Sequence, residues 1–155
     1  MKRVAVVLML TVPLLVIGAG PDDFQATIDF DMSLSRLYKL VQDDAYDLID
    51  PDRYMILQGS VASTAVLDPN EETYQSLLEI VDGEWVGLES ITIYRVYVLL
   101  VGPEFAARVP DRPPRDPGPE VILTNSTVMV VGQFIGVLDE EDGSVSPVIE
   151  AIAIR

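Results

Sequence analysis

The sequence predicts an all-β domain with a single N-terminal helix. From residue 54 onward, runs rich in Val, Ile, Thr and aromatic residues alternate with Asp, Asn, Gly and Pro. The first group favours strands and the second favours turns. Before residue 54, only residues 33–49 place apolar side chains at helical spacing. A chain of 155 residues suits one domain with one core.

The first twenty residues predict a signal peptide. Lys2 and Arg3 precede an apolar run over residues 4–17, and the small residues 18–20 then give way to a polar segment. This order is the pattern of secretory signals. A retained membrane anchor is the alternative, but the run is shorter than the roughly 20 residues that cross a bilayer. We therefore expect a periplasmic or secreted protein.

The chain is strongly acidic and has a restricted chemistry. Its net charge is −15, and without the two basic residues of the leader the balance becomes 8 − 25 = −17. Because such a charge repels phosphates, we expect no nucleic-acid partner. The lack of Cys and His excludes disulfides, thiol or imidazole catalysis and ordinary zinc sites. The acidic turn at residues 139–142 lacks the spacing of a calcium loop, so we expect no metal and no cofactor.

Residues 21–53 are predicted to form an extended lead-in followed by a helix. Ser33 has the character of an N-cap. One apolar face follows it, formed by Leu34, Leu37, Tyr38 and Val41. The apolar phase continues to Ile49, but the acids at 43, 44 and 47 oppose the helix dipole. The phase predicts a helix that runs to about Asp47 and is ended by Asp50-Pro51-Asp52, whereas the acids favour fraying or a break near Gln42.

The remaining residues, 54–155, are predicted to form about five strands. Runs with strand composition cover residues 54–67, 74–81, 84–88, 89–101, 127–138 and 145–154. Gly59 inside the first run predicts a bend or bulge. Asp82–Gly83 predicts a two-residue hairpin turn. Residues 103–119, in which six of the eleven prolines lie, predict an extended surface loop.

This layout resembles the OB-fold, a five-stranded Greek-key barrel. The segments that carry the resemblance are YMILQGSV, ITIYRVYVLLV and TVMVVGQFIGVLDEEDGSVSPVIEAIAI, within residues 54–155. The ending is similar to that of small bacterial OB-like domains. OB-folds commonly have a helix between the third and fourth strands, where this chain has its prolines, so we expect at most a short turn at residues 104–107. The N-terminal helix is then expected to plug one barrel end. A small β-sandwich is the alternative that the same strand count allows.

Two groups of residues are candidates for binding a ligand or partner: the aromatic residues Trp85, Tyr94 and Tyr97, and the loop arginines Arg108, Arg112 and Arg115. In OB-folds, aromatic residues on the second and third strands stack ligands. Because Tyr94 and Tyr97 are three positions apart in a strand, only one of them can share a face with Trp85. Arginine forks suit carboxylates or phosphates, although pairing of Arg112 and Arg115 with Asp111 and Asp116 in a solvated loop is the simpler explanation.

These features predict an exported, non-catalytic binding module of the cell envelope. Its partner would be a protein, a peptide or a glycan that docks on the Pro/Arg loop and the aromatic residues. The alternative is a carboxylate-dependent envelope hydrolase that uses Glu104, Asp111 and Asp116. A purely structural envelope component is the third possibility.

Overall fold

The computed structural model describes residues 27–87, 90–112 and 114–155. The predicted signal peptide, residues 1–20, lies outside this range. The elements are β1 (Ile28–Asp29), α2 (Leu34–Gln42), η1 (Tyr46–Leu48), β2 (Tyr54–Asp68), β3 (Gln75–Val86), β4 (Ser90–Val101), η2 (Pro103–Phe105), β5 (Thr127–Asp139) and β6 (Val145–Ile154). Within the described residues, no helix has the length and apolar character needed to cross a membrane.

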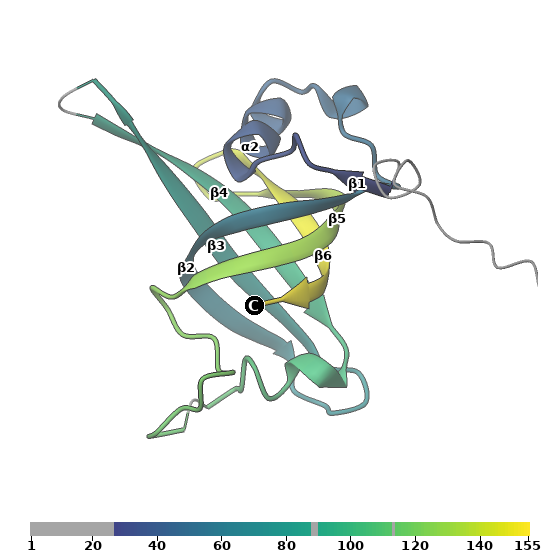
Figure 1. The fold of residues 1–155 in the computed structure, drawn as a ribbon, viewed down its shortest axis with the longest axis vertical. Coiled ribbons are helices and arrows are strands. Elements are labelled where there is room, and N and C mark those ends of the chain that lie inside the picture. Colours follow the sequence, from purple (N-terminus) through teal and green to yellow (C-terminus); the bar gives the residue numbers. More distant parts are fainter. Residues whose placement is uncertain (1–26, 88–89, 113) are drawn as a thin grey trace, which may run out of the picture.

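The strands form one closed sheet (Figure 1). The order is β1-β2-β3-β4-β6-β5, and pairing of β2 with β5 closes the ring. Within the ring, β4 and β6 run parallel, and all the other neighbours are antiparallel. This is the OB-fold arrangement, so the predicted five-stranded barrel with one N-terminal helix is confirmed. The β-sandwich alternative is wrong, because a sandwich stacks two sheets face to face.

Strand β2 takes part in both halves of the barrel. It pairs with β5 from Met55 to Ser60 and with β3 from Ser60 onward. The predicted bend at Gly59 coincides with this change of partner. A Cβ at Gly59 would lie 3.0 Å from both Leu34 Cδ1 and the Val81 carbonyl oxygen, so glycine permits close packing of α2 here.

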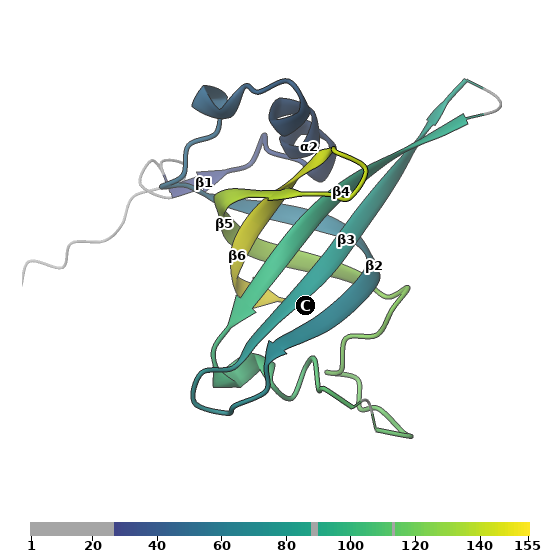
Figure 2. The same ribbon diagram turned by 180° about the vertical axis from the view of Figure 1, so that it is seen from behind.

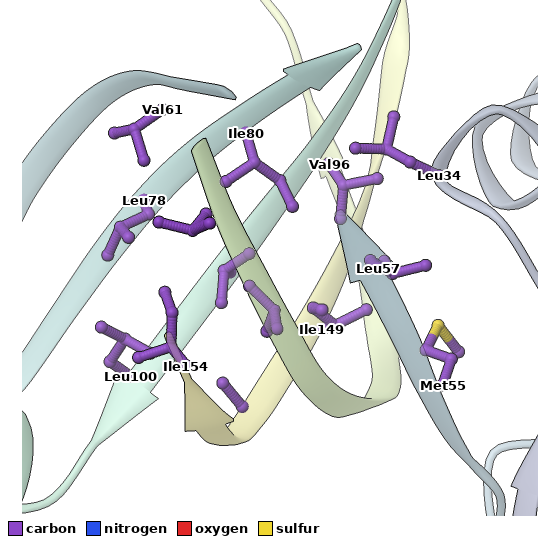
Figure 3. Packing of buried hydrophobic residues seen from close by; sticks show 14 of the residues in the cluster. Leu34, Met55, Leu57, Val61, Leu78, Ile80, Val96, Leu100, Ile149 and Ile154 are labelled. Atoms are coloured by element: carbon purple, nitrogen blue, oxygen red, sulfur yellow. The ribbon is translucent and has the colours of Figure 1, made fainter. Parts of the chain in front are cut away.

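Helix α2 covers one end of the barrel (Figures 1 and 2). The Ser33 Oγ accepts a hydrogen bond of 3.2 Å from the Arg36 amide, which confirms the N-cap. The helix ends at Gln42, where the acids that follow favour a break, and does not run to Asp47 as its apolar phase predicts. Leu34, Leu37 and Val41 are buried and continue the barrel core. Figure 3 shows that core, whose fully buried strand residues include Leu57, Leu78, Ile80, Val96, Leu100 and Ile149.

The connection between β4 and β5 closes the opposite end of the barrel (Figure 1). It begins with η2, which replaces the helix of other OB-folds as the prolines predict. Phe105, Val109 and Ile122 from this connection are buried. The Tyr74 hydroxyl donates a hydrogen bond to the Val109 carbonyl and ties the connection to the start of β3.

The predicted hairpin turn at Asp82–Gly83 is wrong. Strand β3 continues through both residues, which pair with Tyr94 and Ile93 of β4. A type I′ turn would require a positive φ at Gly83, but the positive φ occurs at Gly87, which has φ +71°. The two strands therefore extend beyond the barrel as an arm, defined here as residues 81–86 and 90–95 (Figure 1).

Candidate ligand-binding face

The outer side of the arm is apolar and exposed. Cross-strand pairing sets Trp85 opposite Ile91 and Gly83 opposite Ile93, on the same side as Val81. We call these five residues the arm face. The exposed fractions of Trp85, Ile91 and Ile93 are 67%, 51% and 59%. A monomer seldom leaves so continuous an apolar strip in water unless it binds something there.

The inner side of the arm is held against α2 by polar contacts. The Tyr94 hydroxyl donates a hydrogen bond of 2.6 Å to Glu84. Lys39 Nζ lies 3.8 Å from the Glu84 carboxylate and 4.8 Å from the centre of the Tyr94 ring. The hydrogen bond from Tyr94, followed by the charge of Lys39, lowers the pKa of Glu84. These contacts fix the arm and keep its acidic side chains off the arm face.

Arg95, a cation beside the arm face, is neutralised by two carboxylates. Arg95 Nε lies 2.6 Å from the Glu79 carboxylate, and its Nη1 lies 3.4 Å from Glu140. Burial alone would lower the pKa of Arg95, but the two carboxylates outweigh it and raise the pKa. The Tyr97 hydroxyl donates a 3.3 Å hydrogen bond to Glu140, and burial followed by this carboxylate raises the pKa of Tyr97. Arg95 is thus bound within the protein and is not a free anion receptor.

A larger hollow of about 560 Å³ lies beside the arm, between the segment before α2 and strand β2. Its lining combines apolar and uncharged polar side chains with one acid: Phe30, Met32, Ser33, Leu34, Ile56, Gln58, Gly59, Ser60, Asp82 and Thr127. Ser60 and Asp82 also border a shallower hollow of about 250 Å³ under Ile91 and Ile93. The arm face and the larger hollow are therefore continuous.

The three predicted aromatic site residues lie on both faces of the sheet, as the odd spacing between Tyr94 and Tyr97 predicts. Tyr94 is buried, with 4% of its surface exposed, and contacts Tyr38 edge to face at 5.9 Å. Tyr97 shares the outer side with Trp85, but lies six positions along β4 from the partner of Trp85, about 20 Å away. Trp85 alone of the three belongs to the arm face.

The predicted loop arginines lie at the other end of the molecule. The loop starts directly after Val101, the end of β4 that is far from Trp85 (Figures 1 and 2). Arg108 is half-buried and donates a hydrogen bond to the Ile154 carbonyl, a structural role. Arg112 and Arg115 are exposed. The structure therefore does not bring these arginines together with Trp85.

Other predicted chemistry finds no arrangement to support it. In the described part of the chain, none of Glu104, Asp111 and Asp116 forms an ion pair with an arginine. The described part of the chain also contains no group of three or more Asp or Glu side chains that could hold a metal ion. Ile91 and Ile93 were not among the predicted site residues. The length of the run over residues 89–101 could have indicated them, because it exceeds the length that one strand of a small barrel requires and so predicts a part that extends beyond the barrel.

No protein-family model matches this sequence, and neither does any curated protein. Several solved structures are similar to part of this chain. One is a small single-stranded DNA-binding protein from Mycoplasma pneumoniae, with 14% identity, a TM-score of 0.42, and coverage of 66% of this chain and 90% of that chain. Another is a small single-stranded DNA-binding protein from Streptomyces coelicolor, at 16% identity and a TM-score of 0.38, covering 66% and 89%. The protein PriB from Ralstonia solanacearum has 6% identity and a TM-score of 0.39, covering 66% and 94%.

This finding corrects the functional expectations. Two of these structures are described as single-stranded DNA-binding proteins, against the expectation that excluded nucleic acid. The expected exported envelope module, its hydrolase alternative, the periplasmic or secreted location and the exclusion of nucleic acid are therefore not kept. The exclusion rested on the charge of the whole chain. The arm face itself bears no charged side chain.

Proposed function

We propose that this protein is a non-catalytic OB-fold protein that binds single-stranded nucleic acid on the arm face. The observation that carries the proposal is the exposure of Trp85 beside Ile91 and Ile93. They lie on β3 and β4, the second and third strands of the barrel, which form the ligand surface of many OB-folds. A nucleobase stacks on such a surface through its flat face, independently of sequence.

The charge of the chain determines how such binding would work. Most proteins gain affinity for nucleic acid by releasing counterions from phosphates, which requires free Lys and Arg side chains. Here the net charge is −15, and Arg95 is held by Glu79 and Glu140. Stacking must therefore supply the attraction, while the rest of the protein repels the phosphates. Since salt screens that repulsion, affinity should stay constant or rise as salt increases, the reverse of the usual behaviour.

The position of the only tryptophan offers a direct test. Trp85 is the single Trp of the chain, so tryptophan fluorescence, excited at wavelengths where tyrosine does not absorb, reports on the arm face alone. We expect oligothymidylate of about ten nucleotides to quench this fluorescence and a duplex of the same length to quench it less. Raising the salt from about 0.05 M to about 0.3 M should not weaken the effect.

A labelled oligonucleotide extends the test to variants. Trp85→Ala should weaken binding by roughly 5- to 150-fold, since stacking of one base on an aromatic ring contributes about 1–3 kcal/mol. The matched control is the double variant Arg112→Gln, Arg115→Gln, at the far end of the molecule, which should bind within about twofold of wild type. Absence of any binding, or loss in the loop variant with none in Trp85→Ala, would refute the proposal.

A further inference from the structure

A second outer surface of the barrel has a pattern of its own. On β2, β5 and β6 the register places outward side chains in three rows. The first row holds Gln58, Met129 and Arg155, the middle row holds Ile56, Val131 and Ala153, and the third row holds Tyr54, Gln133 and Glu150. Ile152 is the extra residue of a bulge between the last two rows on β6. We call this surface the three-row face.

The three-row face is apolar and exposed at its centre. Ile152 is 58% exposed and Met129 is 49% exposed, while Ile56 and Val131 are half-buried. Met129, Val131 and Ala153 border a shallow hollow of about 330 Å³. In a chain of which 23% is charged, the three rows contain only two charged side chains, Glu150 and Arg155. The side chains of Glu150 and Arg155 are exposed, and neither forms a hydrogen bond or an ion pair with the described residues.

We infer that the three-row face binds a second copy of this chain, forming a symmetric dimer. A two-fold axis that runs across the strands through the middle row exchanges the first and third rows. That operation sets Arg155 of each copy opposite Glu150 of the other, with the Val131 residues of the two copies facing each other at the centre. Such a self-complementary patch is what an isologous interface requires. Two sheets packed in this way lie about 10 Å apart, within reach of Arg and Glu side chains.

The charge of the chain favours a second copy at this place. Two molecules with a net charge of −15 repel each other wherever acidic surfaces meet. They can associate only through a surface that is uncharged or that pairs its own charges. The three-row face meets both conditions, because its centre is uncharged and its two ends have opposite signs.

Sedimentation equilibrium on the full chain tests the inference. We expect a dimer whose dissociation constant rises about tenfold or more in Ile152→Lys, which places a charge in the centre of the interface. Its matched control is Ile93→Lys on the arm, a residue of nearly the same exposure at 59%, with the same change in net charge. The control should dimerise like wild type.

Charge exchange provides the second measurement. Glu150→Arg and Arg155→Glu should each weaken the dimer, because each leaves two like charges opposite one another. The double variant restores opposite signs and the original net charge, so its dimerisation should recover. A wild-type protein that is monomeric at about 0.5 mM, where contacts with Kd near 1 mM already show, would overturn the inference. A dimer that Ile93→Lys disrupts and Ile152→Lys does not would overturn it too, as would a double variant no better than the single ones.

Discussion

Replacing Gly132 with alanine should destabilise the barrel at the point where it closes. Gly132 is buried in β5 between its two neighbours, opposite Met55 of β2 and Ala151 of β6. A Cβ at this position would collide with the Glu150 carbonyl oxygen and would lie 3.1 Å from the carbonyl carbon and 3.2 Å from Ala151 Cα. All three are backbone atoms, so no rotation of a side chain can relieve the collision.

The expected loss of stability follows from this geometry. Overpacking that forces a backbone shift costs about 1–3 kcal/mol. Disturbing one hydrogen bond of the β5–β6 ladder adds about 1 kcal/mol. The free energy of unfolding should therefore fall by about 2–4 kcal/mol, a large part of the stability of a small domain.

A second glycine provides the control. A Cβ at Gly83, on the arm, would approach only Ile91 Cγ2, at the ordinary distance of 3.4 Å. Gly83→Ala should be neutral or stabilising by up to about 1 kcal/mol, because alanine restricts the unfolded chain. Urea unfolding followed by far-UV circular dichroism measures both variants. If they differ by less than about 0.5 kcal/mol, Gly132 does not close the barrel as the structure indicates.

Three other perturbations test separate parts of the structure. Tyr94→Phe should raise the pKa of Glu84 toward its ordinary 4.5, because the Tyr94 hydrogen bond is the main cause of its lowering. Because the pKa of Glu84 in the folded protein is lowered, the stabilisation from this contact is fully present above pH 4.5. It is lost as the pH falls through the pKa of Glu84 in the folded protein. An NMR titration of Glu84 that is the same in wild type and variant would contradict this. Arg95→Leu leaves its two carboxylate partners facing each other, so unfolding at pH 7 should become easier by about 1–2 kcal/mol. Urea unfolding at pH 7 measures this loss, and a free energy of unfolding equal to that of wild type would argue against repulsion between the two carboxylates. Phe105→Ala should lower the free energy of unfolding by about 3–4 kcal/mol, since it leaves a cavity where the buried ring closes the end of the barrel. A thermal unfolding midpoint within about 2 °C of wild type would show that Phe105 does not stabilise this end of the barrel.

Local pattern was sufficient to predict most of the fold. The alternation of β-branched residues located β4, β5 and β6 to within one or two residues, and Ser33 located the start of α2. The apolar phase carried the predicted helix past its actual end at Gln42, where the acids favour a break. The prediction failed at Asp82–Gly83. This dipeptide favours a turn when it ends a strand, but here cross-strand pairing with Ile93 and Tyr94 keeps it extended. Pairing with residues about ten positions away determined the conformation of Asp82–Gly83, and the local sequence around this dipeptide does not indicate that pairing.

The site was less predictable than the fold. Parity along β4 correctly separated Tyr94 from Tyr97, since a strand alternates its faces. The clustering of arginines with prolines in the sequence, however, said nothing about their distance from Trp85. That distance depends on which end of β4 each segment adjoins, and β4 spans the barrel. The net charge was a poor guide to the partner for a similar reason, because it sums the charges of all surfaces, whereas a ligand contacts only one of them.

The arm face and the three-row face share no residue, although the larger hollow beside the arm is lined in part by Ile56 and Gln58 of the three-row face. The two proposals can be tested independently through Trp85 and Ile152, which lie outside that hollow. The arm face lies on β3 and β4, and the three-row face lies on β2, β5 and β6. A dimer formed through the three-row face therefore leaves both arms exposed, one on each copy. Ile152→Lys should then bind oligothymidylate with the wild-type affinity per chain, while Trp85→Ala should sediment as a dimer and bind oligothymidylate more weakly. Loss of both properties in either variant would mean that one surface performs both tasks, in which case the physical separation argued from the register is wrong.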